Sequence, residues 1–200
     1  MNFANLENHV ALVTGASGGL GRVIANELAR GGASVAVHYF NNQDGALETA
    51  RGLKSNQKPH HLFQADLAGD DIDEVAQKLI EDVKAKFGDI TILVNNAADQ
   101  VLSSIINMDS ISWSHMQNST LRSAIALTRA AMREMLPGSS VINISSVEAV
   151  KPFLNHSHYA AAKAALESFT LASALRFLAS ESASGITGTV LTVDAGWLNG

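Results

Sequence analysis

Residues 10–25 read VALVTGASGGLGRVIA: an apolar run, a glycine-rich turn and the start of a helical pattern. Glycines at this place let backbone N–H groups approach a phosphate at a helix N-terminus, where the helix dipole favours negative charge. A plain tight turn is the alternative for a glycine cluster alone, but this cluster directly follows the first apolar run. The stretch therefore predicts a phosphate-binding turn between a buried strand and a helix.

Short apolar or β-branched runs alternate with longer helical patterns along the rest of the chain. We expect strands at Val10–Val13, Ser34–Tyr39, His60–Gln64, Ile90–Val94, Ser140–Ile144 and Thr189–Val193. We expect helices at Gly21–Arg30, Gln43–Ser55, Ile72–Phe87, Ser110–Leu136 and Tyr159–Ala179. This alternation predicts an α/β protein in which a Rossmann-type, doubly wound parallel sheet is flanked by helices on both faces, in a single domain over residues 1–200.

The composition excludes several classes of function and of site. The apolar fraction of 46% and charged fraction of 16% fit a globular protein, and the net charge of −5 without a Lys/Arg run argues against nucleic-acid binding. The absence of cysteine excludes disulfides, thiolate metal sites and cysteine nucleophiles. Because no apolar run could span a bilayer and the first residues lack a signal-peptide pattern, we expect a soluble, cytoplasmic protein with no membrane partner and no metal.

Three residues late in the chain suggest carbonyl chemistry. Reduction of a carbonyl by hydride leaves an alkoxide that must be protonated, and a cation beside a tyrosine favours the phenolate form that can exchange that proton. Tyr159 and Lys163 lie four residues apart on a predicted helix, so they share a face, and Ser146 can hydrogen-bond the substrate oxygen. A surface Tyr and Lys are the alternative for this spacing by itself.

Taken in order along the chain, these motifs resemble those of the short-chain dehydrogenase/reductase family, classical type, and in particular its 3-oxoacyl-(acyl-carrier-protein) reductases. Residues 14–21 resemble the family's cofactor motif, and residues 95–98 its Asn-Asn-Ala-Gly motif with Ala98 in place of glycine. Residues 145–146 and 159–163 resemble its catalytic pattern, and residues 188–196 its C-terminal signature. The resemblance covers nearly the whole chain.

The resemblance implies an NAD(P)-dependent oxidoreductase that moves a hydride between the nicotinamide and a carbonyl/alcohol substrate. Tyr159 would be the general acid/base, and Lys163 would also hold the nicotinamide ribose. The Ser-to-Tyr spacing favours Ser146 over Ser145 as the third catalytic residue. Cofactor contacts are expected at Thr14, Gly15, Ser17, Gly19, Leu20, Gly21, Tyr39, Asp66, Asn95, Ala97, Tyr159 and Lys163. Family members commonly form homotetramers, here through Ser110–Leu136 and Tyr159–Arg176; a dimer is the alternative.

The cofactor choice depends on the end of the second predicted strand. The position where a carboxylate would bind the ribose of NAD matches Tyr39, so NADP is favoured and NAD remains possible. Arg22, Ser17 and residues 41–42 are candidates for contacts to the added phosphate, whereas Asp44 reads as a helix-start residue. Asp66 matches the family's adenine-contacting residue, with a turn or helix cap as the alternative.

Two departures from the family pattern bear on mechanism. The family's relay asparagine, seven residues beyond a Trp, corresponds to Thr120 when counted from Trp113, and Asn118 lies on a different helix face in a structural role. In addition, Arg176 runs directly into Phe177, where the family has a strand and a substrate lid. Either residues of the natural chain are absent here or the protein lacks that segment; we favour the first, because a lost central strand would expose apolar faces.

Other residues near the motifs receive no role. His156, His158, Glu148 and Phe153 border the segment before the catalytic tyrosine and read as loop residues, and Trp197 reads as packing or interface. A catalytically impaired nucleotide-binding regulator or scaffold of the same fold is the alternative function. Thr120 and the gap favour it, while the intact Ser146, Tyr159 and Lys163 favour the enzyme.

Overall fold

The computed structural model describes residues 5–54 and 57–178 of the chain. Its strands are β1 (Val10–Val13), β2 (Ser34–Tyr39), β3 (His60–Gln64), β4 (Ile92–Asn95) and β5 (Ser140–Asn143). Its helices are α1 (Gly19–Gly31), α2 (Gln43–Lys54), α3 (Ile72–Phe87), α4 (Ser110–Gln117), α5 (Ser123–Met132) and α6 (Ser157–Leu178). A π-helical turn, η1 (Asn118–Arg122), joins α4 to α5, and a 3-10 turn, η2 (Val147–Ala149), follows β5.

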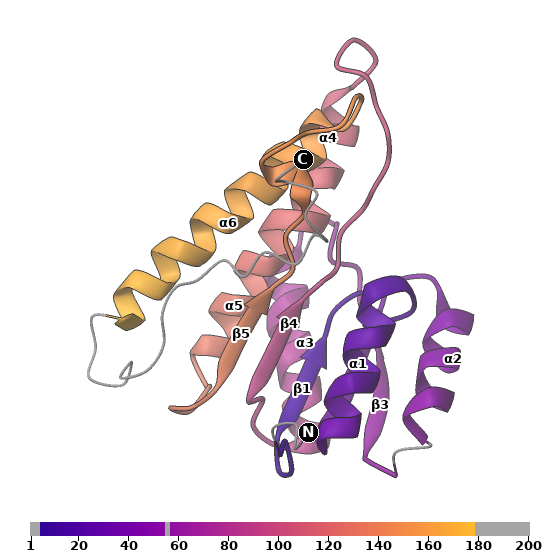
Figure 1. The fold of residues 1–200 in the computed structure, drawn as a ribbon, viewed down its shortest axis with the longest axis vertical. Helices are drawn as coiled ribbons and strands as arrows, with labels where there is room; N and C mark the ends of the chain where they lie inside the picture. Colours follow the sequence, from indigo (N-terminus) through magenta and orange to yellow (C-terminus); the bar gives the residue numbers. More distant parts are fainter. Residues whose placement is uncertain (1–4, 55–56, 179–200) are drawn as a thin grey trace.

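The five strands form one parallel sheet in the order β3-β2-β1-β4-β5 (Figure 1). The chain builds outward from β1 to β3 and then returns to build β4 and β5 on the other side. This confirms the predicted doubly wound sheet. The reversal places a topological switch point between β1 and β4, and ligands of such sheets bind in the crevice outside the carboxyl ends of the strands at that point.

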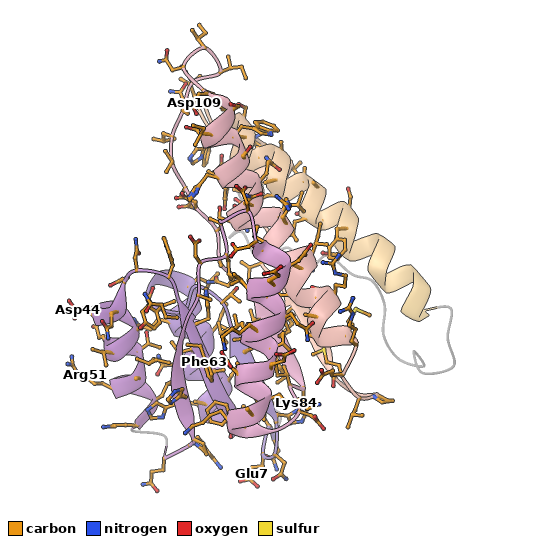
Figure 2. All side chains as sticks on the ribbon, turned by 180° about the vertical axis from the view of Figure 1, so that it is seen from behind. Glu7, Asp44, Arg51, Phe63, Lys84 and Asp109 are labelled. Carbon is orange, nitrogen blue, oxygen red and sulfur yellow. The ribbon has the colours of Figure 1, made fainter. Side chains whose placement is uncertain are left out.

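Two apolar cores cover the two faces of the sheet. Alternate residues of β1, such as Leu12, face α3 and α5, while their neighbours, such as Val13, face α1 and α2. The four residues of β1 are all buried, as expected for a strand with helices on both faces. In Figure 2, which shows the molecule from behind, Glu7 and Lys84 lie near one end and Asp109, at the start of α4, near the other. The loops that follow the carboxyl ends of β4 and β5 extend toward that second end.

One predicted helix differs in the structure. The single helix expected over 110–136 is divided by η1 and ends at Met132. The break falls at Asn118, Ser119 and Thr120, residues whose polar side chains compete with the helical backbone for hydrogen bonds. The Asn118 amide indeed leaves the helix to donate to Ala68 O at 3.0 Å.

The C-terminal part of the chain is described only in part. Helix α6 runs without a break across Arg176 and Phe177. The strand expected at Thr189–Val193, the motif at 188–196 and Trp197 lie outside the described residues. Among the helices that are described, none is both long and apolar enough to cross a membrane.

Candidate active site

The glycine turn has the geometry that the sequence predicts. Gly15 and Gly19 adopt positive φ angles of 63° and 51°, which side chains other than glycine rarely tolerate. Gly21 needs its lack of a side chain for another reason, because a Cβ there would lie 2.4 Å from the carbonyl oxygen of Gly15. The turn therefore brings its backbone close to the N-terminus of α1, where phosphates bind in such folds.

Thr14 holds this turn against the Asn-Asn-Ala motif. Its buried Oγ1 accepts hydrogen bonds from the N–H groups of Asn96 and Ala97 at 3.0 and 2.9 Å. The Asn96 side chain donates back to Thr14 O at 2.9 Å. The carboxyl ends of β1 and β4 are thus joined at the switch point, and Thr14 stabilises the shape of the turn rather than exposing its hydroxyl to a ligand.

A groove of about 360 Å³ lies along this edge of the sheet. It is lined by Gly15, Ser17, His38, Phe40, Asn41, Asp66, Leu67, Ala68, Asn96, Ala97, Ala98, Asp99, His115 and Ser119. Four predicted cofactor residues, Gly15, Ser17, Asp66 and Ala97, are therefore brought together. Residues from the glycine turn and from the ends of β2, β3 and β4 meet in one groove, as a nucleotide site requires.

Other predicted cofactor residues have side chains placed elsewhere. Tyr39 is packed in the core beside α1 and α2, and the strand end that lines the groove consists of Phe40 and Asn41 instead. Strand alternation explains this, since the side chain of Tyr39 points to the face opposite that of its neighbour His38. Leu20 is 55% exposed on α1 and does not line the groove.

Asn95 is a structural residue in this arrangement. Its buried amide donates to Thr128 Oγ1 at 3.1 Å and to Asn143 Oδ1 at 2.8 Å. Asn143 in turn donates to Thr170 Oγ1 at 2.8 Å. This polar chain links β4 to α5, β5 and α6, so the first asparagine of the motif supports the site from behind while its second asparagine and Ala97 line the groove.

Most of the residues considered for contacts to the additional ribose phosphate of NADP already bond to other protein groups. The Arg22 guanidinium pairs with Glu48 at 2.8 Å and donates to Thr49 Oγ1 at 3.1 Å. Asn42 Oδ1 accepts from Gly45 N, so this side chain caps α2, where Asp44 lies in the first turn as predicted. Of these candidates, Ser17 and Asn41 remain on the groove lining.

The acidic residues of the groove have partners of their own. Asp66 accepts from Ala68 N at 2.8 Å, so it forms the turn that was the alternative for this residue, and it also faces the groove; its contact with the adenine stays a prediction. Asp99 lies 2.9 Å from Nε2 of His115, and both residues line the groove. Sequence reasoning missed Asp99 and His115, whose pairing depends on the path of the chain between β4 and α4.

Tyr159 and Lys163 are adjacent on the first turns of α6, as their spacing predicts. The Lys163 ammonium lies 5.6 Å from the centroid of the Tyr159 ring and donates to Ile144 O at 2.6 Å. Burial lowers the pKa of Lys163 to about 8. The Tyr159 hydroxyl is contacted by Gln100 Nε2 at 3.4 Å. Because Gln100 closely follows Ala97, one short segment connects the groove to this hydroxyl.

The two serines have distinct partners, and these separate their roles. Ser145 Oγ donates to Glu167 Oε1 at 2.6 Å, so its proton is committed to the protein. Ser146 Oγ accepts from Glu148 N at 3.2 Å, an interaction that leaves its own O–H available to donate. This supports the choice of Ser146 that the motif spacing suggested.

A buried Glu148–His156 contact, to which the sequence assigned no role, stabilises the loop between Ser146 and Tyr159. Nδ1 of His156 lies 2.9 and 2.8 Å from the two carboxylate oxygens of Glu148, and Phe153 N donates to the same carboxylate at 3.3 Å. The His156 ring then contacts the Tyr159 ring, with centroids 5.4 Å apart. Glu148 thereby connects the serine loop to the start of α6.

Thr120, the predicted counterpart of the family's relay asparagine, makes its side-chain contacts within its own helix. Thr120 is buried and its hydroxyl points to Met116 Sδ at 3.5 Å, one turn back along the helix. Asn118 donates to Ala68 O and accepts from Arg122 at 2.8 Å, which agrees with the structural role expected for it.

In the described part of the chain, no group of three or more acidic or histidine side chains is arranged to hold a metal ion.

A family model described as short chain dehydrogenase matches residues 9–188 of this sequence. The chain belongs to that family. Among the relatives of this chain, the NADPH-dependent aldehyde reductase 1 of Arabidopsis thaliana is 36% identical over 178 residues, which are 86% of this chain and 61% of that protein. The 3-oxoacyl-(acyl-carrier-protein) reductase FabG of Escherichia coli (strain K12) is 35% identical over 190 residues, 94% of this chain and 73% of that protein.

Solved structures agree with the family assignment. A short chain dehydrogenase from Burkholderia cenocepacia J2315 in complex with NADP superposes with a TM-score of 0.81 at 32% identity, covering 87% of this chain and 70% of that one. The landomycin C-6 ketoreductase LanV with bound NADP and rabelomycin gives a TM-score of 0.80 at 31% identity, covering 88% and 72%. The chain thus spans 61 to 73% of the length of these four proteins.

Proposed function

We propose that this short chain dehydrogenase transfers hydride between NADP(H) and a carbonyl/alcohol substrate, with Tyr159 as the general acid/base. The observation that carries the proposal is the Tyr159–Lys163 pair at the end of β5, joined to the nucleotide groove through Gln100. A surface tyrosine and lysine would be exposed, whereas these side chains are 3% and 2% exposed. Their burial beside the groove favours a catalytic pair.

The groove fits a dinucleotide in its chemistry. Gly15 and Gly19, with their positive φ angles, let the backbone of the turn lie close to the N-terminus of α1, where phosphates bind in such folds. Ser17 and Asn41 add neutral polar side chains that could hydrogen-bond the nucleotide. Gly15, Ser17, Asp66, Asn96 and Ala97 would hold the nucleotide, and Lys163 the nicotinamide ribose. The cofactor, when bound, supplies or accepts the hydride.

The chain's own residues would manage the proton. Tyr159 would donate its hydroxyl proton to the substrate oxygen during reduction and accept it during oxidation. The Lys163 ammonium beside the ring favours the phenolate that remains, and the Ile144 carbonyl holds one of its three N–H donors. Ser146 would donate to the same substrate oxygen as charge develops there.

The preference for NADP rests on the end of β2. Phe40 and Asn41 line the groove there, so no carboxylate stands where NAD-binding folds place one for the ribose hydroxyls. The names of the Arabidopsis relative and of the Burkholderia complex agree with NADP. Comparing the Kd of NADPH with that of NADH tests the preference, and tighter NADH binding would overturn it.

Turnover by the purified chain tests the reaction. NADPH oxidation is followed against aldehydes, aromatic ketones and β-keto thioesters, with Tyr159→Phe as the matched variant. Apolar carbonyls belong in the panel because the loops beside Tyr159 expose Leu102, Ile106 and Leu154. Loss of the hydroxyl should lower kcat/KM by about 10²–10⁴-fold, the usual contribution of a positioned acid/base, while the Kd of NADPH stays within about twofold.

A nucleotide-binding regulator without turnover is the second candidate. The observation that favours it is Thr120, whose hydroxyl faces Met116 instead of supporting a relay toward Lys163. Tight NADPH binding with no Tyr159-dependent turnover on any carbonyl of the panel would establish this alternative and end the enzyme proposal.

We also propose a homo-oligomer that uses α5 and α6. Ile125, Met132 and Phe169 line a shallow, mainly apolar hollow on these helices, and Met132 is 53% exposed. Covering such a hollow would remove apolar surface from water. The mass in solution, measured by light scattering, distinguishes a tetramer, a dimer and a monomer.

A further inference from the structure

His38 occupies an unusual place for a histidine, in the buried part of β2 beside the glycine turn. It is 2% exposed. Its Nδ1 atom accepts a hydrogen bond from Gly15 N at 3.1 Å, and its backbone carbonyl accepts one from Ala16 N at 2.8 Å. A single residue of β2 therefore holds two consecutive amides of the turn.

The other side of the ring reaches β3. Nε2 of His38 lies 3.1 Å from the carbonyl oxygen of Ala65, the residue before Asp66. The amide of Gly15 can only donate and the carbonyl of Ala65 can only accept, so the ring must be neutral with its proton on Nε2. Burial lowers the pKa of His38 to about 4, which keeps the ring in this form near neutral pH.

These contacts place one side chain between two parts of the nucleotide groove. Gly15 and Asp66 both line that groove, the first on the glycine turn and the second at the exit of β3. We propose that His38 is a positioning residue for the adenosine-phosphate half of the dinucleotide, because it holds the turn and the β3 exit at a set separation. This inference rests on the proposed function, since it assumes that the groove binds a dinucleotide.

The chemistry of the position limits what can replace histidine. The site requires one acceptor and one donor on a single side chain, at opposite ends of a rigid ring. Phenylalanine fills a similar volume without either group, and glutamine carries both on a flexible side chain. Comparing the Phe and Gln variants of His38 therefore separates the effect of its hydrogen bonds from the effect of its packing.

The test uses calorimetry to measure the Kd of NADPH and the Kd of 2′,5′-ADP. The second ligand carries the adenosine and its phosphates without the nicotinamide. We expect His38→Phe to raise both Kd values about tenfold, the effect of losing a positioning hydrogen bond, and His38→Gln to recover most of the loss. His9→Phe is the matched control: His9 bonds Thr91 Oγ1 through Nδ1 at 3.0 Å, just before β1 at the opposite edge of the sheet. It should leave both Kd values unchanged.

Several results would overturn the inference. A folded His38→Phe protein with both Kd values within twofold of wild type would do so, as would a rise for NADPH without one for 2′,5′-ADP. If His38→Phe does not fold, His38→Ala and His38→Gln decide: weaker binding by the Ala variant that the Gln variant largely recovers supports the role of the two hydrogen bonds, whereas wild-type Kd values in the Ala variant, or a Gln variant that binds as weakly as the Ala variant, reject it. Wild-type protein that binds no dinucleotide would remove the proposed function and this inference together.

Discussion

The two halves of the sheet are held together in different ways. On the half proposed to bind the nucleotide (β1–β3 with α1 and α2, here the nucleotide side), all residues of β1 are buried, and α1 and α2 pack on the sheet through alanine and leucine side chains. On the half proposed to hold the acid/base (β4 and β5 with α6, here the catalytic side), Ser140 and Ile142 of β5 are exposed, and within the described residues β5 is the edge of the sheet. Helix α6 inclines away from the sheet toward its C-terminal end (Figure 1).

On the catalytic side, where residues of β5 are exposed, hydrogen bonds between polar side chains join the elements. Asn95 bonds Asn143, Ser145 bonds Glu167, and Glu148 bonds His156. Apolar burial is non-directional and tolerates small shifts, whereas a buried hydrogen-bonded pair is directional, and loss of one partner leaves the other unsatisfied. The free energy of unfolding should therefore respond mainly to changes in shape on the nucleotide side, and to changes in single polar groups on the catalytic side.

The largest effect should come from Lys163. Lys163→Met keeps the length of the side chain but removes its charge, and we expect kcat/KM to fall about 10²–10⁴-fold because the phenolate loses its neighbouring cation. In the wild type, Lys163 has a pKa lowered to about 8, so the ammonium is present below that pH and is lost above it. The rate should therefore decline above about pH 8.

The pH profile of kcat/KM measures this, and Lys163→Arg is the control, since arginine stays charged throughout. An active Lys163→Met variant with wild-type kcat/KM would show that the Lys163 ammonium has no part in the mechanism. An alkaline decline that persists unchanged in an active Lys163→Arg protein would assign that decline to another group.

A smaller effect, on stability, should follow from a change of shape on the nucleotide side. A Cβ at Gly21 would lie 2.4 Å from Gly15 O and 2.6 Å from Asn96 Nδ2, so Gly21→Ala should lower the free energy of unfolding by about 1–3 kcal/mol. Gly18→Ala is the matched control, because no atom lies within 4 Å of a Cβ there. Urea unfolding compares them; equal midpoints would show that the close approach at Gly21 is not required.

The smallest effect should come from Glu148→Gln on the catalytic side. The amide keeps the shape of the carboxylate but weakens its bonds to His156 and Phe153 N, and we expect about 1–2 kcal/mol of lost stability with a few-fold lower kcat/KM. The Kd of NADPH should not change. Glu134→Gln, at an exposed ion pair with Lys84, should have little effect on either quantity. A weaker NADPH affinity in Glu148→Gln would show that the two sides are coupled.

The sequence predicted the order of strands and helices because period and turn chemistry are local properties. The bounds of β1, β2, β3 and α3 agree with the prediction residue for residue. The juxtaposition of Tyr159 and Lys163 could also be predicted, since a spacing of four residues on a helix places two side chains on the same face. The division of the long helix at η1 was missed, because it depends on where the Asn118 amide finds a partner outside the helix.

What the sequence determined by itself was the family, the parallel α/β sheet and the residue types at the ends of its strands. Only the tertiary structure decided which of those residues face the groove: Phe40 and Asn41 rather than Tyr39, and Asn96 rather than Asn95. It also revealed His38 and Gln100, which no motif marks. The reason is physical: side-chain direction at a strand end, and hydrogen bonds between residues far apart in the chain, are set by how neighbouring strands and loops pack.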